Sequence, residues 1–127
     1  MMKDLIINGS RQLDIPLDDV QVDKLMEYAR LLVEWNEKIN LTAITDDEGI
    51  VTKHFLDSLT AIKTGYVKGK VIDVGTGAGF PGLVLKIAKP EIKLTLLDSL
   101  NKRINFLNEV CNLCNLSNVI TICLLYT

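Results

Sequence analysis

Three glycines at alternate positions constrain the fold of this chain more than any other feature. The run 71–74, rich in β-branched residues, predicts a strand just before them, and the segment 81–89 just after them has the pattern of a helix. The glycines are Gly75, Gly77 and Gly79. A glycine loop between a strand and a helix brings backbone amides close to a ligand, where any Cβ would obstruct it. The loop therefore predicts an α/β fold with a ligand site at the carboxyl end of a strand.

The segments after the loop repeat the alternation of strand and helix. The run 93–97 predicts a second strand that ends at Asp98, the segment 101–115 predicts a helix, and 119–123 predicts a third strand. The order strand, helix, strand, helix, strand is typical of a parallel sheet with right-handed crossovers. We therefore expect three parallel strands.

The first half of the chain has a helical period. A short helix is expected across 2–12, and a capping-box pattern at 45–48 predicts another helix from near Asp46 toward Lys63. Between them lies the longest expected helix, whose start Pro16 and Asp18 favour. Its expected apolar face is formed by Val22, Leu25, Met26, Ala29, Leu32, Val33 and Ile39.

The glycine spacing separates two classes of adenosine cofactor. A dinucleotide site has the pattern GxGxxG, but Phe80 stands where its third glycine is needed. Asp73 instead lies two residues before a GxGxG loop, which looks like the first motif of S-adenosylmethionine-dependent methyltransferases. Asp98, 23 residues after Gly75, can accept hydrogen bonds from both hydroxyls of a ribose. The alternative is a tight turn between strand and helix with a capping acid and no ligand.

Four short motifs occur in order along the chain. They are WNEKINLT at 35–42, HFLDS at 54–58, DVGTGAGFPG at 73–82 and LLDSLNKR at 96–103. Together they resemble the RsmG (GidB) family, the small-subunit ribosomal RNA guanine-N7 methyltransferases. The resemblance runs from about Leu17 to about Ile120.

This resemblance implies a Rossmann-like, S-adenosylmethionine-dependent methyltransferase fold. The chain would hold an N-terminal helical segment over 1–64 and the first part of the methyltransferase domain over 65–127. The resemblance also implies S-adenosyl-L-methionine as methyl donor and 16S rRNA of the small ribosomal subunit as substrate. Because guanine N7 has a free lone pair and no proton to lose, such a reaction depends on alignment more than on a general base.

The same resemblance assigns site residues by position. The expected cofactor-binding residues are Asp73, Gly75, Gly77, Gly79, Phe80 and Asp98, and the candidates near the mouth of the site are Asn40, Thr42, His54, Asp57 and Ser58. Lys102 and Arg103 are candidates for contact with RNA.

Several candidates have alternative structural explanations. Asn40 and Thr42 can end a helix and cap the next turn. His54 and Asp57, three residues apart on a helix, can hydrogen-bond each other. Lys102 and Arg103 suit a solvated first turn of a helix, and Trp35 at helical spacing suits the core better than a base-stacking platform.

Composition excludes other classes of protein. No stretch approaches the roughly 20 apolar residues of a membrane helix, and the N-terminus does not resemble a signal peptide, so we expect a cytoplasmic protein. Cys111, Cys114 and Cys123 indicate free thiols, and no metal site is expected because a structural zinc site needs four ligands. Residues 1–50 carry a net charge of −6 and residues 51–127 one of +4, and this basic second half is compatible with a phosphate-bearing partner.

The resemblance to the family ends after Ile122, where the chain reads CLLYT to its end. We interpret this as truncation, which would leave β-branched residues of the first strand (Val71, Ile72 and Val74) at an unpaired sheet edge. Self-association or partial disorder is then expected, and so is weak or absent methylation. Two further alternatives are a nicotinamide-nucleotide-binding module, which Phe80 disfavours, and a non-catalytic rRNA-binding remnant whose binding would depend strongly on salt.

Overall fold

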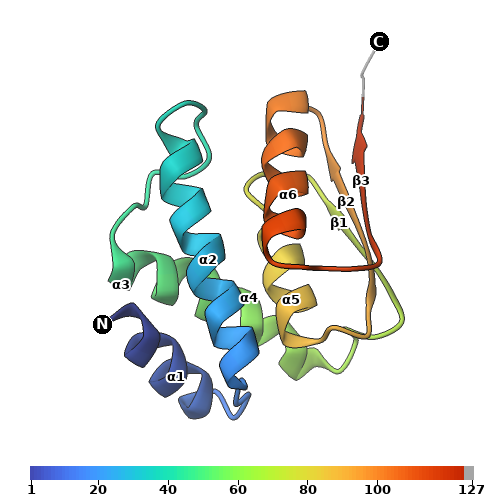
Figure 1. The fold of residues 1–127 in the computed structure, drawn as a ribbon. Coiled ribbons are helices and arrows are strands. Elements are labelled where there is room, and N and C mark those ends of the chain that lie inside the picture. The colour runs from blue at the N-terminus through green and yellow to red at the C-terminus, as the bar shows by residue number, and fades with distance from the viewer. Residues whose placement is uncertain (125–127) are drawn as a thin grey trace.

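The computed structural model describes residues 1–124, and it forms helices packed on a three-stranded sheet (Figure 1). The run CLLYT therefore ends outside the described residues. The elements are α1 (Met2–Gln12), α2 (Asp19–Asn36), α3 (Asp47–Gly49), a π-helical segment η1 (Ile50–Leu56), α4 (Asp57–Leu59), a 3₁₀ segment η2 (Thr60–Thr64), β1 (Lys70–Val74), α5 (Gly82–Ala88), β2 (Lys93–Asp98), α6 (Asn101–Leu113) and β3 (Val119–Cys123).

The sheet is parallel in the order β1-β2-β3, which confirms the three expected strands. Val74 lies opposite Leu97, and Leu97 lies opposite Ile122, so the carboxyl ends of all strands meet at one edge. This edge is at the top of Figure 1, where β3 rises toward the end marked C. The glycine loop and Asp98 therefore share that edge, as parallel pairing requires.

Helix α2 lies between two layers and is buried on more sides than its sequence period predicts. Its start is confirmed: the Asp18 carboxylate accepts from the Gln21 amide, and the Gln21 side chain accepts from the Asp18 amide. Tyr28 and Leu31 are buried although they lie outside the expected apolar face. Val33, which that face included, is exposed. The prediction was wrong at Val33 because α2 packs against α1 on one side and α5 and α6 on the other.

The expected third helix is a continuous helical path of four segments from Asp47 to Thr64. Asp46, not Thr45, caps its start, because the Asp46 carboxylate accepts from the Gly49 amide at 2.9 Å. Gly65 ends the path with a left-handed φ of 78°, which favours glycine.

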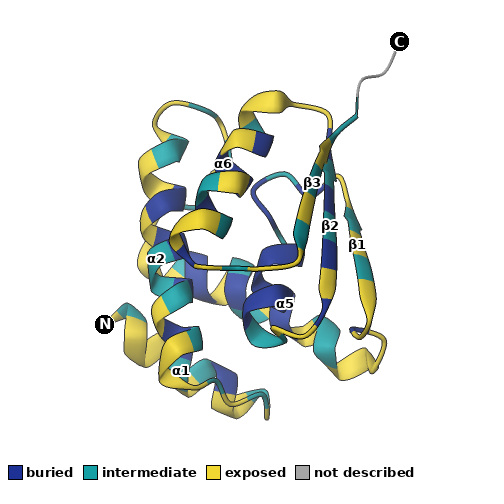
Figure 2. Ribbon diagram, turned by 45° about the vertical axis from the view of Figure 1, so that its right-hand side comes forward, coloured by how far each residue is buried: buried dark blue, intermediate teal, exposed yellow. Residues whose placement is uncertain are grey.

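Only one face of the sheet is covered. Helices α5 and α6 pack on one side, and Figure 2 shows no element over the other within the described residues. The exposed fraction is 63% for Ile72 in β1 and 60% for Ile120 in β3, and Val74 and Ile122 are exposed on the same strands. Parallel sheets normally bury both faces, so this bare apolar face is unusual.

None of the helices within residues 1–124 combines the length and the apolar character that crossing a bilayer requires.

Candidate cofactor site

The three glycines of the loop have different surroundings, although all have positive φ. A Cβ built on Gly75 or Gly77, with φ of 71° and 58°, would meet nothing within 4 Å. A Cβ on Gly79 would lie 2.5 Å from the Tyr28 hydroxyl, so that glycine permits close packing inside the protein. Only Gly75 and Gly77 thus face open space, which is the property a cofactor loop needs.

Asp98 holds the loop at the end of β2. Its side chain is 4% exposed, and its two carboxylate oxygens accept from the Gly77 amide at 3.1 Å and from the Leu100 amide at 3.0 Å. The Arg103 guanidinium lies 3.4 Å from the second oxygen. Each carboxylate oxygen can accept about two hydrogen bonds. The oxygen bound to Gly77 can therefore accept one more from a ligand, and on the oxygen bound to Leu100 a ligand would compete only with the long Arg103 contact.

Asp73 supports the loop from β1. One carboxylate oxygen accepts from the Thr76 hydroxyl at 2.8 Å and from the Gly82 amide at 2.9 Å. Burial raises the pKa of Asp73, and these two hydrogen bonds partly oppose that rise. The carboxylate therefore joins both ends of the glycine loop through one of its two oxygens.

Replacing Asp73 by asparagine tests this arrangement through pH. An amide oxygen can still accept from Thr76 and Gly82, but it has no charge to desolvate. The pKa of this carboxyl is higher in the folded protein than its ordinary value of 3.8, which holds in the unfolded chain. The folded protein therefore loses stability as the pH rises above 3.8 and the carboxyl ionises. We therefore expect Asp73→Asn to become more stable relative to wild type as the pH rises, measured by urea unfolding. A difference independent of pH would contradict this.

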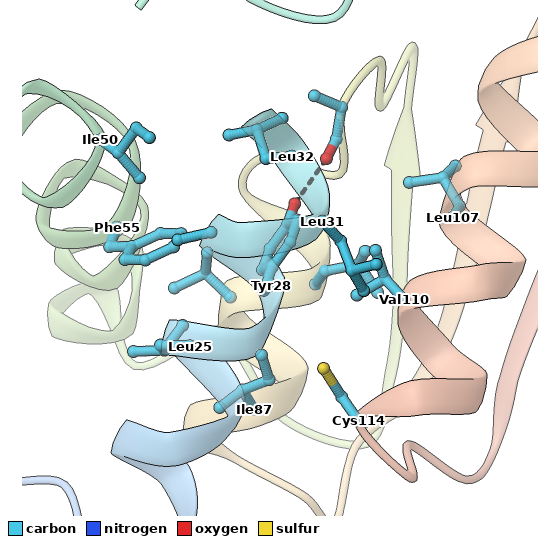
Figure 3. Close-up of a cluster of buried hydrophobic side chains, with 14 of the residues drawn as sticks. Leu25, Tyr28, Leu31, Leu32, Ile50, Phe55, Ile87, Leu107, Val110 and Cys114 are labelled. Atoms are coloured by element: carbon cyan, nitrogen blue, oxygen red, sulfur yellow. Dashed lines mark hydrogen bonds between the residues drawn. The ribbon is translucent and has the colours of Figure 1, made fainter. Parts of the chain in front are cut away.

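An aromatic stack connects the loop to the N-terminal helices. The Phe80 ring stacks on His54 of η1 with centroids 4.3 Å apart, and on Tyr28 of α2 at 5.4 Å. The buried Tyr28 hydroxyl donates to the Ala78 carbonyl inside the loop, the dashed line in Figure 3. Figure 3 also shows Phe55 beside Tyr28 among the core side chains. The helical segment thus fixes the position of the loop.

His54 is hydrogen-bonded to Thr42, with 2.8 Å between Nε2 and the hydroxyl oxygen. The alternative of a bond between His54 and Asp57 is wrong within the described residues. The reason is that His54 lies in the π-helical segment η1, which has more residues per turn than an α-helix. Side chains three residues apart therefore do not lie on the same face. Burial lowers the pKa of His54, with Asp57 acting in the opposite direction, so the ring is neutral at pH 7.

Two hollows gather most of the remaining candidates. One, of about 350 Å³, is lined by Glu37, Lys38, Ile39, Asn40, Leu100, Lys102 and Arg103. The other, of about 250 Å³, is lined by Lys53, His54, Asp57, Ser58, Ala61, Phe80 and Pro81. The structure therefore brings Asn40 to the basic pair on α6, and it brings His54, Asp57 and Ser58 to the outer side of Phe80. Trp35 is half-buried and packs on Phe106, as the core interpretation expects.

Two residues that support the site were missed in the sequence. Tyr28 holds the loop, and the side-chain oxygen of Asn36 (Oδ1) accepts from the backbone amides of Leu41 and Thr42 at 2.8 and 2.9 Å. Asn36 lies inside the first motif, at the end of a helix, where a side-chain oxygen often accepts from nearby backbone amides. Its role could therefore have been predicted from the sequence. Tyr28 had no local signal, because its partner is fifty residues away.

Two free cysteines, Cys111 in α6 and Cys114 just after its end, face the protein interior. Cys114 is buried and Cys111 half-buried, and burial raises the pKa of each thiol to about 11. Both are therefore protonated near neutral pH, and a protonated thiol is a poor nucleophile and metal ligand.

Comparison with known proteins gives a consistent family. Residues 21–124 match the family model GidB, described as rRNA small subunit methyltransferase G. The chain is 56% identical over 112 residues to the ribosomal RNA small subunit methyltransferase G of Alkaliphilus oremlandii, covering 87% of this chain and 47% of that protein. It is 55% identical over 121 residues to the protein of the same name from Clostridium perfringens (strain 13), covering 94% and 51%. The chain spans about half the length of these curated relatives.

Proposed function

The chain belongs to the GidB family of rRNA small subunit methyltransferases, and on that premise we propose that it binds S-adenosylmethionine for methylation of guanine N7 in 16S rRNA. The observation that carries the proposal is the open side of Gly75 and Gly77 beside the buried Asp98 carboxylate. The proposed substrate belongs to the small ribosomal subunit, which would place the protein in the cytoplasm.

The residues present fit this cofactor. Asp98 would accept from the ribose hydroxyls, and its negative charge would repel a 2′-phosphate. Gly75 and Gly77 would let the backbone approach the methionine portion, and Asp73 would attract the cofactor amine. When bound, S-adenosylmethionine supplies a methyl group on a positively charged sulfur.

The chain's own residues would then align the base with the donor. Guanine N7 gives up no proton, so no residue has to act as a general base. Neutral His54, with Asp57 and Ser58, lines the hollow beside Phe80, and Asn40 lines the second hollow with Lys102 and Arg103. We assign the basic pair to RNA phosphates, where Arg103 can exchange its long contact with Asp98 for a phosphate.

Methyl transfer to small ribosomal subunits tests the proposal. The subunits come from cells that lack this methylation, the donor carries a labelled methyl group, and the modified base is mapped by cleavage at N7-methylguanine. Weak label, confined to one guanine of 16S rRNA, is the expected result. A folded chain that leaves 16S rRNA unlabelled, or that labels another position of the base, would refute the activity for this chain.

The sequence predicts self-association through the unpaired edge of the sheet, but the exposed apolar residues lie on its face, and we propose that the chain self-associates through this bare sheet face. Ile72 and Ile120 should prefer another apolar surface to water. Sedimentation equilibrium should therefore show a concentration-dependent oligomer, and Ile72→Lys with Ile120→Lys should give a monomer. Val20→Lys is the matched control, because Val20 is 60% exposed on α2, away from the sheet. A wild-type monomer at all concentrations, or equal dissociation by Val20→Lys, would contradict the proposal.

A further inference from the structure

A basic surface lies at the edge of the sheet opposite the glycine loop. Five lysines and one acid, Glu91, occur in the segments 61–70 and 89–93, which adjoin at the amino ends of β1 and β2. The lysines are Lys63, Lys68, Lys70, Lys89 and Lys93. All are exposed except Lys89, which is half-buried and donates to the Val67 carbonyl at 2.7 Å. We call this set the amino-edge lysines.

Like charges are held close together there without carboxylate partners. Lys70 and Lys93 are direct neighbours across β1 and β2, and the Lys93 amide donates to the Gly69 carbonyl at 2.8 Å. The salt bridges within residues 1–124 involve only Arg30 and Arg103, so the amino-edge lysines have no acidic partner there. Repulsion between neighbouring lysines costs stability, and an anionic partner would relieve it.

Tyr66 lies in the turn before β1, between Lys63 and Lys68 in the sequence. Its side chain is 85% exposed, whereas the adjacent Val67 is buried against Leu85 and Ile92. The turn is well defined, because Gly65 has left-handed φ and the Tyr66 amide donates to the Thr64 hydroxyl at 3.2 Å. An exposed aromatic ring on a segment that also carries exposed lysines combines the two elements that bind single-stranded nucleic acid, a stacking surface and phosphate neutralisation.

We propose that Tyr66 and the amino-edge lysines form a second RNA-binding surface, which takes a single-stranded segment by stacking one base on Tyr66. This inference rests on the proposed function, which supplies RNA as the substrate, and extends it to a contact remote from the donor site. Strand β1 separates the two by about 13 Å, the length of five residues in a strand. In Figure 1 the segment leading into β1 lies at the bottom, and the carboxyl ends of the strands lie at the top.

Fluorescence anisotropy with a labelled single-stranded RNA tests the surface. Tyr66→Ala should weaken binding at least about fivefold, whereas Tyr66→Phe keeps the ring and should bind like wild type. Lys68→Gln with Lys93→Gln should reduce the slope of log K against log salt concentration by about 1.4, or about 0.7 for each lost phosphate contact. Lys3→Gln with Arg11→Gln removes two exposed charges from α1 and should leave the slope unchanged.

Two further measurements separate the possible causes. Heparin is a polyanion without bases, so Tyr66→Ala should bind it as wild type does. Titration with S-adenosylmethionine should give the same Kd for wild type and every variant. If wild type did not bind S-adenosylmethionine, the proposed function would be refuted, whereas the RNA result would stand. Wild type that does not bind RNA, Tyr66→Ala that binds RNA normally, or equal loss of salt dependence in the α1 control would overturn the second surface.

Discussion

Gly75→Ala should weaken binding of S-adenosylmethionine at least about tenfold while the protein stays folded. The new methyl group would enter the open space that the loop presents, because a Cβ at Gly75 meets no protein atom within 4 Å. The proposed cofactor would occupy that space. Isothermal titration with S-adenosylmethionine and with S-adenosylhomocysteine measures the loss.

Gly69→Ala is the matched control for this substitution. Gly69 has a φ of 64°, close to the 71° of Gly75, and its Cβ would also meet nothing within 4 Å. Both alanines therefore pay a similar cost of about 1–2 kcal/mol for left-handed backbone. Gly69 lies at the other end of β1, so its variant should lose a similar amount of stability and bind the cofactor normally. Equal loss of binding in the two variants would mean that backbone strain, and not obstruction, causes the effect.

Tyr28→Ala should have the largest effect on stability, about 3–5 kcal/mol in the free energy of unfolding. Tyr28 is fully buried, packs against Phe55 and Phe80, and donates to the Ala78 carbonyl. Truncation would leave a cavity between α2 and the glycine loop and a buried carbonyl without its donor. Urea unfolding followed by circular dichroism measures this loss.

Two other tyrosine variants divide the effect into its parts. Tyr28→Phe keeps the packing and removes only the hydroxyl, so we expect a loss of about 1–3 kcal/mol from the unsatisfied Ala78 carbonyl. Tyr66→Ala removes an exposed ring and should change stability by no more than about 0.5 kcal/mol. If Tyr28→Ala were no more destabilising than Tyr66→Ala, the proposed support of the loop by α2 would be wrong.

The parts of the fold with a strong local pattern could be predicted from the sequence. The glycine loop, the three parallel strands and the two helices that connect them, α5 and α6, follow from short runs whose period or glycine content is decisive. The position of Asp98 beside the loop could also be predicted. The glycine loop follows β1 and Asp98 ends β2, and the carboxyl ends of neighbouring parallel strands lie at the same edge of a sheet.

The contacts that position the loop could not be predicted, because they join distant segments. Nothing near Tyr28 indicates that its hydroxyl meets Ala78, and nothing near His54 indicates a bond to Thr42 instead of Asp57. The different surroundings of Gly75 and Gly79 also depend on which helix lies against the loop. Sequence patterns located the loop, whereas tertiary packing determines which of its glycines face a ligand.

The most direct test of this account is a titration of the chain with S-adenosylmethionine, compared with a nicotinamide dinucleotide under the same conditions. The account predicts saturable binding of S-adenosylmethionine at one site and no binding of the dinucleotide, because Phe80 replaces the third glycine that a pyrophosphate site requires. A folded chain that binds neither compound, or that prefers the dinucleotide, would contradict the assignment of the glycine loop and Asp98 as a methyl-donor site.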